Sequence, residues 1–205
     1  MLRALRKLAC SRLASLEEKL PVVRYQWEMP GQMLHLDIKR LGKIDGFGHR
    51  KVGTRQVHRR RPGWEYLHVC VDGASRLAYV AIFSDETAES AVKFLWFAVA
   101  WYASHGIKVE RVLTDNGACY KSWNFRDVCR EFSIKHKRTR PYRPQTNGEA
   151  ERFIKIALKE WAYAPTYTHS RQRTDYLSIW TYRYNYVRPH SALGRKPPAS
   201  KLGAG

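Results

Sequence analysis

The sequence predicts an α/β protein in which a mixed five-stranded sheet is flanked by helices. Two observations predict this fold class: three strand-like segments come in succession, and helix-like and strand-like segments alternate after them. With 205 residues, 44% of them hydrophobic and 13% aromatic, the chain is long enough for one domain with a sizeable core. We expect a helix and linker over residues 1–30, a core domain over 31–164, and a helical extension with a basic tail over 165–205.

Three β-branched or aromatic runs form the first half of the predicted sheet. They cover residues 33–41, 64–71 and 77–83. Asp72-Gly73 follows the second run and is a dipeptide typical of tight hairpin turns, so the second and third strands are expected to pair. Between the first two runs, residues 42–63 combine glycines with many Lys and Arg residues, and we expect an exposed basic loop or hairpin there.

Helices and strands alternate in the rest of the chain. Apolar residues recur every three to four positions in the predicted helices. The expected elements are a helix over 87–104, a strand over 109–113, a helix around 125–132, a strand over 133–137, a helix over 148–161 and a helix over 174–186. A short basic helix is also expected over residues 1–20. This order of elements is typical of the ribonuclease H-like fold.

The charge of the chain predicts a polyanionic partner. Lys and Arg total 37 against 18 Asp and Glu, which gives a formal net charge of +19. Such an excess is unusual for an enzyme of small-molecule metabolism and is typical of nucleic-acid-binding proteins. The four cysteines include no C-x-x-C pair, so neither a zinc site nor a disulfide scaffold is expected. No run of about 18 apolar residues occurs, so a membrane-spanning helix is not expected either.

Three carboxylates lie where metal-dependent chemistry needs them. Asp37 lies in the middle of a predicted strand, Asp115 at the end of another, and Glu151 in the first turn of a predicted helix. A carboxylate within an apolar strand is costly unless a cation or hydrogen-bond donors meet it. Oxygen ligands without Cys or His suit Mg²⁺ or Mn²⁺. Two such ions about 4 Å apart activate an attacking oxygen and stabilise the leaving oxygen of a phosphodiester, so the pattern predicts a nuclease or strand-transfer reaction.

Each carboxylate also has a simpler interpretation. In that interpretation, Asp37 forms an ion pair with a basic neighbour in its strand, and Asp115 forms a side-chain turn with Gly117. Glu151 is then a residue that the helix dipole favours and that pairs with Lys155, four positions further on. Only the joint spacing and the flanking sequence favour catalysis at all three positions.

The spacing of the last two carboxylates completes a known pattern, because 35 residues separate Asp115 from Glu151 (151 − 115 − 1). The flanking strings are L-H-L-D-I-K, V-D-G-A-S-R, L-T-D-N-G, R-P-Q-T-N-G-E-A-E-R-F and Y-N-Y-V-R-P-H-S-A-L-G. Together they resemble the D,D(35)E motif of the integrase core that retroviral integrases share with bacterial insertion-sequence transposases. The resemblance covers roughly residues 30–200 and is stronger to the bacterial branch.

This resemblance implies a site and a function. It implies that Asp37, Asp115 and Glu151 bind two Mg²⁺ or Mn²⁺ ions. It also implies that Glu149 does not bind them and that residues 144–148 are a flexible catalytic loop. The implied activity is that of a DDE-type transposase or integrase, which hydrolyses DNA phosphodiester bonds and joins a 3′-hydroxyl end to target DNA. Element ends and target DNA are then the expected partners, a homo-oligomer is the expected assembly, and the nucleoid in the cytoplasm of a bacterium is the expected location.

Basic and polar residues around the third carboxylate are expected to contact DNA. Residues 135–143 contain five positive charges and no acid, directly before the expected catalytic loop. Such contacts are made mainly to phosphates and give affinity and salt sensitivity without sequence choice. The candidates are Lys137, Arg138, Arg140, Tyr142, Arg143, Gln145, Asn147, Lys155 and Lys159. The alternative is a solvated basic surface.

Asp72 is a fourth acidic candidate in the sequence. We assign it to the structure of its turn.

Two other functions remain open beside transposition. One is a ribonuclease H-like nuclease without strand transfer, against which the Asn-Gly loop and the terminal R-P-H string argue. The other is a truncated, non-catalytic nucleic-acid-binding module derived from a transposase, against which the intact carboxylates argue. Members of the family normally carry helix-turn-helix domains before the core, and residues 1–20 are consistent with the last helix of such a domain. This is consistent with a truncated product or with an alternative start of the chain.

Overall fold

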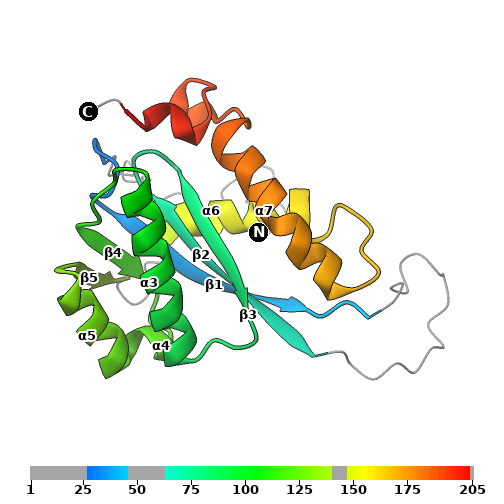
Figure 1. Ribbon diagram of the computed structural model, residues 1–205, viewed down its shortest axis with the longest axis horizontal. Helices are drawn as coiled ribbons and strands as arrows, with labels where there is room; N and C mark the ends of the chain where they lie inside the picture. Colours follow the sequence, from blue (N-terminus) through cyan, green and yellow to red (C-terminus); the bar gives the residue numbers. More distant parts are fainter. Residues whose placement is uncertain (1–26, 46–62, 140–146, 204–205) are drawn as a thin grey trace, which may run out of the picture.

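A five-stranded sheet forms the centre of the computed structural model, which describes residues 27–45, 63–139 and 147–203 (Figure 1). The strands lie in the order β3-β2-β1-β4-β5. β1, β2 and β3 are antiparallel neighbours, whereas β4 runs parallel to β1 and β5 runs parallel to β4. The strands are β1 (Leu34–Gly42), β2 (Trp64–Asp72), β3 (Ala78–Phe83), β4 (Arg111–Thr114) and β5 (Lys135–Arg138). The prediction of a mixed five-stranded sheet flanked by helices is confirmed.

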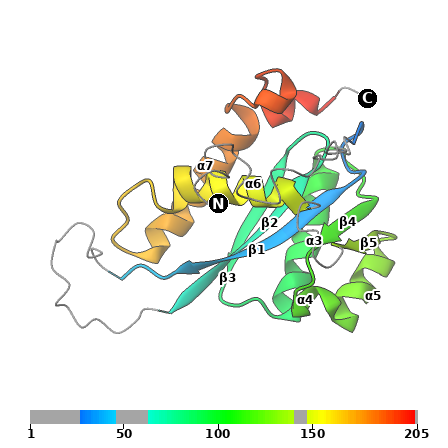
Figure 2. The ribbon, with the colours of Figure 1, turned by 180° about the vertical axis from the view of Figure 1, so that it is seen from behind.

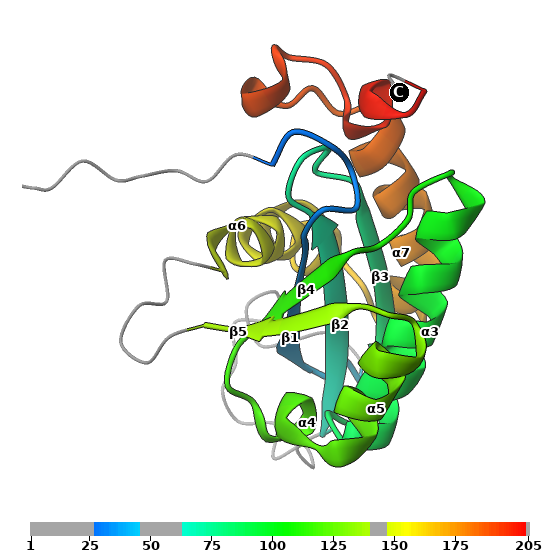
Figure 3. The same ribbon diagram turned by 90° about the vertical axis from the view of Figure 1, so that its left-hand side faces the viewer.

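Helices cover both faces of this sheet. α3 packs on one face, where it lies in front of the sheet in Figure 1, and α6 packs on the other, where it lies in front in Figure 2. α4 and α5 lie beside α3 (Figure 3), and α7 packs with α6. The helices are α3 (Ala88–Ser104), α4 (Ala118–Lys121), α5 (Trp123–Glu131), α6 (Gly148–Ala157) and α7 (Ser170–Tyr186). A π-helical turn (Leu158–Ala162) follows α6, and short 3-10 turns (Ser191–Leu193 and Pro198–Lys201) follow α7.

The sheet separates two apolar clusters because successive side chains of a strand point to opposite faces. In β1, Leu34 and Leu36 belong to the cluster under α3, and Leu41 belongs to the cluster under α6. The second cluster also contains Leu177 and Trp180 of α7. The closing helix therefore packs on the core of its own chain.

Some predicted boundaries differ from the structure. β4 and β5 each begin two residues later than predicted, and the helix predicted over 148–161 is α-helical only to Ala157. α7 begins at Ser170, four residues earlier than predicted, because its first turn is polar and carries no apolar periodicity. A long-range contact holds that turn: Ser170 Oγ accepts a hydrogen bond from the backbone N–H of Ile44 (2.7 Å), and the N–H of Ser170 donates to the carbonyl of Ile44 (3.0 Å).

Two predicted segments lie outside the described residues: the helix over 1–20 and most of the basic segment 42–63. Gly42 and Trp64, at the two ends of that segment, are paired across β1 and β2. Within the described ranges, the helices are all too short or too polar to cross a membrane.

Candidate active site

Asp37 lies in β1 on the face of the sheet that α6 covers, the same face as Leu41. Its side chain is half-buried, and its Oδ1 accepts a hydrogen bond from the backbone N–H of Ile38 (2.8 Å). Burial, together with the negative charges of Asp115 and Glu151 nearby, raises the pKa of Asp37 to about 6, although the hydrogen bond acts in the opposite direction. The charge of this carboxylate is therefore costly unless a cation lies close to it.

Asp115 directly follows β4, the strand beside β1. The two strands are parallel, and Leu34 is paired with Val112, an offset of 78 positions (112 − 34). Asp37 and Asp115 each lie two residues after the last pair of this register, His35 and Leu113, so both lie toward the same end of two neighbouring strands. The side chain of Asp115 is exposed, and its Oδ1 accepts a hydrogen bond from the backbone N–H of Gly117 (2.8 Å).

Glu151 lies in the first turn of α6, and Asn147, the residue before this helix, fastens the helix to β1. The Nδ2 of Asn147 donates a hydrogen bond to the backbone carbonyl of Leu36 (3.0 Å), and its Oδ1 lies 3.3 Å from Nδ1 of His35. Leu36 is the residue directly before Asp37. The helix that carries the third carboxylate therefore starts beside the strand that carries the first.

The three carboxylates form an oxygen-only donor set of the kind that binds Mg²⁺ or Mn²⁺. A divalent cation would also relieve the repulsion that contributes to the raised pKa of Asp37. Over residues 27–45, 63–139 and 147–203, however, the structure contains no group of three or more His, Cys, Asp or Glu side chains that is placed to hold a metal ion. The carboxylate oxygens are ligands that suit a divalent cation. In this conformation, however, the three side chains are not placed to bind one together.

The simpler interpretation holds for one carboxylate of the three. Asp115 does form the turn with Gly117, where an added Cβ would lie only 3.0 Å from the Oδ1 of Asp115. Among the described residues, neither Asp37 nor Glu151 forms an ion pair within 4.0 Å, so the pairs with strand neighbours and with Lys155 are not present. Local structure thus explains Asp115 but not the other two acids.

Comparison with protein families shows what kind of domain carries these residues. A family model described as "Integrase core domain" matches residues 28–144, more than half of the chain, and a second model with the same description matches residues 132–198. The chain belongs to the integrase core domain family. The first match contains Asp37 and Asp115, and the second contains Glu151.

Curated relatives of this integrase core come from mobile elements and viruses. The transposase InsD of insertion element IS2D from Escherichia coli (strain K12) is 32% identical over 90 residues, which are 44% of this chain and 30% of the relative. The Gag-Pro-Pol polyprotein of squirrel monkey retrovirus is 30% identical over 126 residues, 60% of this chain and 6% of the relative. The putative integrase ORF3 of Spiroplasma virus SpV1-C74 is 24% identical over 152 residues, 68% of this chain and 42% of the relative. The chain thus spans less than half the length of each of these relatives.

Solved structures show the same fold. An integrase chain of the simian T-cell lymphotropic virus intasome, in complex with the PP2A regulatory subunit B56 gamma, superposes with a TM-score of 0.69 at 20% identity and covers 92% of this chain and 60% of that chain. The catalytic core domain of BIV integrase gives a TM-score of 0.56 at 18% identity, with 84% and 93% covered. The HTLV-2 integrase catalytic core in complex with magnesium gives 0.52 at 18% identity, with 86% and 98% covered. The ribonuclease H-like fold predicted from the order of elements is therefore confirmed.

The residues predicted to contact DNA occupy different settings in the integrase core. Lys137 and Arg138 are exposed on β5, and Lys155 and Lys159 are exposed on α6 and the π-helical turn. The predicted residues Arg140, Tyr142, Arg143 and Gln145 lie outside the described residues. Asn147 differs from the exposed group, since it is 3% exposed and its amide binds β1. In this conformation its side chain connects protein elements and does not face outward.

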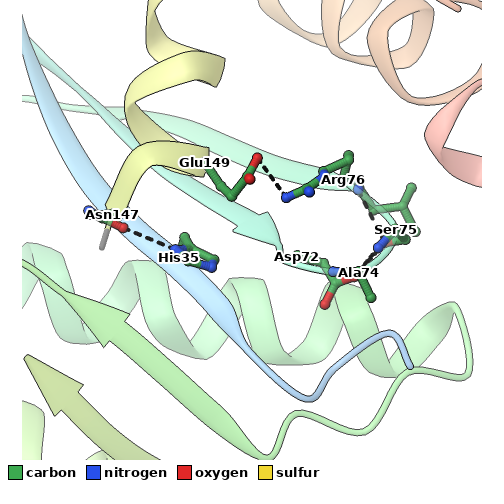
Figure 4. A network of polar contacts seen from close by, with 8 residues as sticks. His35, Asp72, Ala74, Ser75, Arg76, Asn147 and Glu149 are labelled. Carbon is green, nitrogen blue, oxygen red and sulfur yellow. Dashed lines mark hydrogen bonds and ion pairs between the residues drawn. The ribbon is translucent and has the colours of Figure 1, made fainter. Parts of the chain in front are cut away.

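Several residues that connect the elements of the site were not predicted from the sequence. Arg76 forms an ion pair with Glu149 (2.6 Å), and His35 lies beside Asn147, as Figure 4 shows. Asp72 stabilises its turn, as predicted, by accepting a hydrogen bond from the N–H of Ser75 (2.6 Å). The sequence contained one signal for this network, because Glu149 stands inside the motif string without a metal-binding role. Its partner lies in a distant turn and had no local signal.

Proposed function

We propose that this integrase core is a metal-dependent enzyme that cleaves DNA phosphodiester bonds and joins a 3′-hydroxyl end to target DNA. One observation carries the proposal: Asp37, Asp115 and Glu151 come from β1, the end of β4 and the start of α6, which are neighbouring elements of the fold, and the charges of Asp115 and Glu151 add to the burial that raises the pKa of Asp37. The family and the D,D(35)E spacing support the same assignment.

The chain contributes position and charge to this reaction. Asp37 is held by a central strand, Asp115 by its hydrogen bond from the backbone N–H of Gly117, and Glu151 by a helix whose preceding residue, Asn147, binds β1. Mg²⁺ or Mn²⁺ bound by the three carboxylates would activate the attacking oxygen and stabilise the leaving oxygen of the phosphodiester. The magnesium complex of the HTLV-2 integrase core supports this choice of ion.

Exposed basic residues supply the proposed DNA contacts, among them Lys137 and Arg138 of β5. The net charge of +19 supports binding to the phosphate backbone. Lys137→Ala is expected to weaken binding similarly for all DNA sequences, because a phosphate contact does not depend on the base. Log affinity should also fall less steeply with log salt concentration, with a slope that is smaller in magnitude by about 1. A loss confined to one DNA sequence would contradict a phosphate contact.

The assembly and the domain limits are part of the proposal. Related integrases are described as dimeric, as trimeric and as part of an intasome, and we propose a homo-oligomer for this chain acting on element ends and target DNA. Bacterial relatives support action on nucleoid DNA in the cytoplasm of a bacterium. We also propose that residues 31–164 are the catalytic core, that residues 165–205 extend it, and that residues 1–30 precede it as a helix and linker.

The deciding experiment is cleavage and joining of a labelled DNA oligonucleotide in Mg²⁺ or Mn²⁺ by the wild-type chain and by Glu151→Gln. This variant preserves the shape of the side chain and removes its charge, and Glu160→Gln is the matched control on the following π-helical turn. We expect product from the wild type and the control but not from Glu151→Gln. Equal product from all three would contradict the assignment of Glu151.

A DNA-binding module without catalysis is the second candidate function. The absence, among the described residues, of a carboxylate group already placed to hold a metal ion favours it. The same experiment separates the two functions. If all three proteins bind DNA and none forms product in either metal, the non-catalytic function is the correct one.

A further inference from the structure

We infer that Arg76 and Glu149 are positioning residues, which together with Asn147 set the orientation of the first turn of α6 so that Glu151 faces Asp37. This inference rests on the proposed function and deepens it. Glu149 lies only two residues before Glu151, and the resemblance to the D,D(35)E motif assigns it no part in binding metal. The structure instead gives it a partner on the turn between β2 and β3 (Figure 4).

The Arg76–Glu149 ion pair is short and sheltered. The Nη1 of Arg76 lies 2.6 Å from the Oε2 of Glu149, and the two side chains are 15% and 29% exposed. By comparison, the pair between Arg188 and Glu160 has a distance of 2.8 Å and exposures of 29% and 37%. Partial exclusion of water strengthens the attraction between two opposite charges. The pair near the site is therefore better suited to hold a helix turn than an exposed surface pair.

Arg76 lies in a turn that several hydrogen bonds hold in place. The carboxylate of Asp72 accepts hydrogen bonds from the N–H (2.6 Å) and the hydroxyl (2.7 Å) of Ser75, and from the N–H of Gly31 (2.8 Å). Arg76 itself has a φ of 67°, a left-handed conformation that is uncommon for a side chain of its size. Its backbone N–H donates to the carbonyl of Asp72 (3.0 Å), which closes the turn. The turn thus presents the guanidinium from a fixed position.

Helix geometry converts this contact into an orientation of Glu151. An α-helix has 3.6 residues per turn, so residues two positions apart point in directions about 200° apart. When Arg76 holds Glu149 on one side of α6, Glu151 must point to the other side. Asn147 adds a second attachment, because its amide binds the carbonyl of Leu36 next to Asp37. Two contacts, one to the turn and one to β1, therefore fix the same helix turn.

Most of the packed apolar side chains of α6 follow this turn, in which Ala150 is also buried. Phe153, Ile154 and Ala157 are buried in the cluster under α6, and Glu151 precedes them. Their packing holds the body of the helix, whereas the side chains of Asn147 and Glu149 hold its start. Loss of the ion pair should consequently leave the fold intact and loosen the position of the carboxylate.

The test is Mn²⁺ binding measured by titration calorimetry on the full chain without DNA, in the wild type, Glu149→Ala, Arg76→Ala and the double variant. Residues that orient metal ligands typically contribute about 10- to 100-fold in metal affinity, so we expect each single variant to bind Mn²⁺ at least about 10-fold more weakly. The double variant should be no weaker than either single variant, because both remove one interaction. Arg76→Lys keeps the charge and should recover part of the affinity.

Glu160→Ala is the matched control, because it breaks the ion pair with Arg188 away from the first turn of α6. It should bind Mn²⁺ like the wild type. Hydrogen exchange at the amides of residues 151–153, whose N–H groups donate to the carbonyls of the first turn, gives a readout of that turn and should accelerate only in the Arg76 and Glu149 variants. Wild-type affinity in Glu149→Ala, or losses that add in the double variant, would overturn the inference.

The outcome for Glu151→Gln separates this inference from the proposed function. If that variant loses Mn²⁺ binding while Glu149→Ala and Arg76→Ala retain it, the metal site stands and the positioning inference fails. If Glu151→Gln binds Mn²⁺ like the wild type, the proposed metal site fails, and the positioning inference fails with it.

Discussion

On the α3 face of the sheet, Phe94 and Leu95 are fully buried among other apolar side chains, and the buried hydroxyl of Tyr102 binds the backbone of β2. On the α6 face, several buried polar side chains bind the backbone of the strands. Asn147 binds β1, Asn185 binds both backbone groups of a residue in β3, and Arg173 binds the end of β1. Apolar contacts have no preferred direction, but hydrogen bonds do. The face that carries the candidate carboxylates therefore has side-chain hydrogen bonds to two of its strands, β1 and β3, at three buried polar residues.

The largest expected effect concerns the buried ion pair on the α6 face. The Nη2 of Arg173 lies 2.6 Å from the Oε2 of Glu65, and the side chains are 0% and 12% exposed. Arg173→Met would leave a nearly buried carboxylate without its partner, and we expect a loss of about 3–5 kcal/mol in the free energy of unfolding. Urea denaturation measures it. The control is Arg173→Met with Glu65→Leu, which should recover most of the loss; equal losses in both would show that packing matters and the pair does not.

On the α3 face, Leu95→Ala should lower the free energy of unfolding by about 3 kcal/mol, because the side chain is fully buried and its removal leaves a cavity. Below the midpoint of thermal unfolding, Mn²⁺ affinity should stay at the wild-type value. Lys93→Ala, an exposed change on the same helix, should alter stability by less than about 0.5 kcal/mol. A lower Mn²⁺ affinity in folded Leu95→Ala would mean that the two faces are not independent.

Asp37→Asn should stabilise the integrase core at high pH when metal is removed with EDTA. The pKa of Asp37 in the folded chain is raised to about 6, so its contribution to stability is present below the pKa of the unfolded chain and is lost as the pH rises through 6. The variant removes this loss. We expect a gain of about 2 kcal/mol at pH 8 and none at pH 3, measured by urea denaturation, because one pKa unit corresponds to about 1.4 kcal/mol and the site keeps some contact with water.

Asp127→Asn serves as the control for that measurement, since Asp127 is largely exposed and forms a surface ion pair with Arg130. Its stability should change by less than about 0.5 kcal/mol at either pH. A destabilised Asp37→Asn protein at pH 8 would contradict the cost assigned to the buried charge.

The smallest expected effect compares two helix starts. Ser122 caps α5 by accepting a hydrogen bond from the backbone N–H of Phe125 (3.2 Å), whereas the side chain of Asn147 makes no such cap and binds β1 instead. Ser122→Ala should reduce the free energy of unfolding by about 1 kcal/mol, and Ser122→Asp should restore it. Thermal unfolding provides the measurement. A change in Mn²⁺ affinity in Ser122→Ala would contradict the view that a helix cap stabilises the fold without positioning the metal ligands.

Most of the fold could be predicted because its signals are local. β-Branched and aromatic runs located β1, β2 and β3, and the Asp72-Gly73 dipeptide predicted the pairing of β2 with β3, which the structure confirms. The start of α7 could not be located, because its first turn is polar and is held by a hydrogen bond to Ile44. The π-helical turn after Ala157 was also missed, since its apolar pattern is the same as that of a regular helix.

The candidate site, like the fold, was predicted from the sequence only in part. Spacing and flanking strings pointed to Asp37, Asp115 and Glu151, and the structure places these three acids on neighbouring elements. Their roles as metal ligands stay predictions. Asn147 was predicted to contact DNA from its place in the loop string, but its buried amide shows that composition alone does not tell an outward from an inward side chain.

Periodicity and turn dipeptides are local properties of the chain, and motif spacing can be read directly from it, so the sheet, its helices and the three acids could be predicted from the residues alone. Which polar groups meet could not be predicted in this way. His35 and Asn147 are 112 positions apart, and Glu65 and Arg173 are 108 apart. Such contacts depend on strand register and on how each helix packs, so no local pattern specifies them. The orientation of Glu151 is set by contacts of this kind.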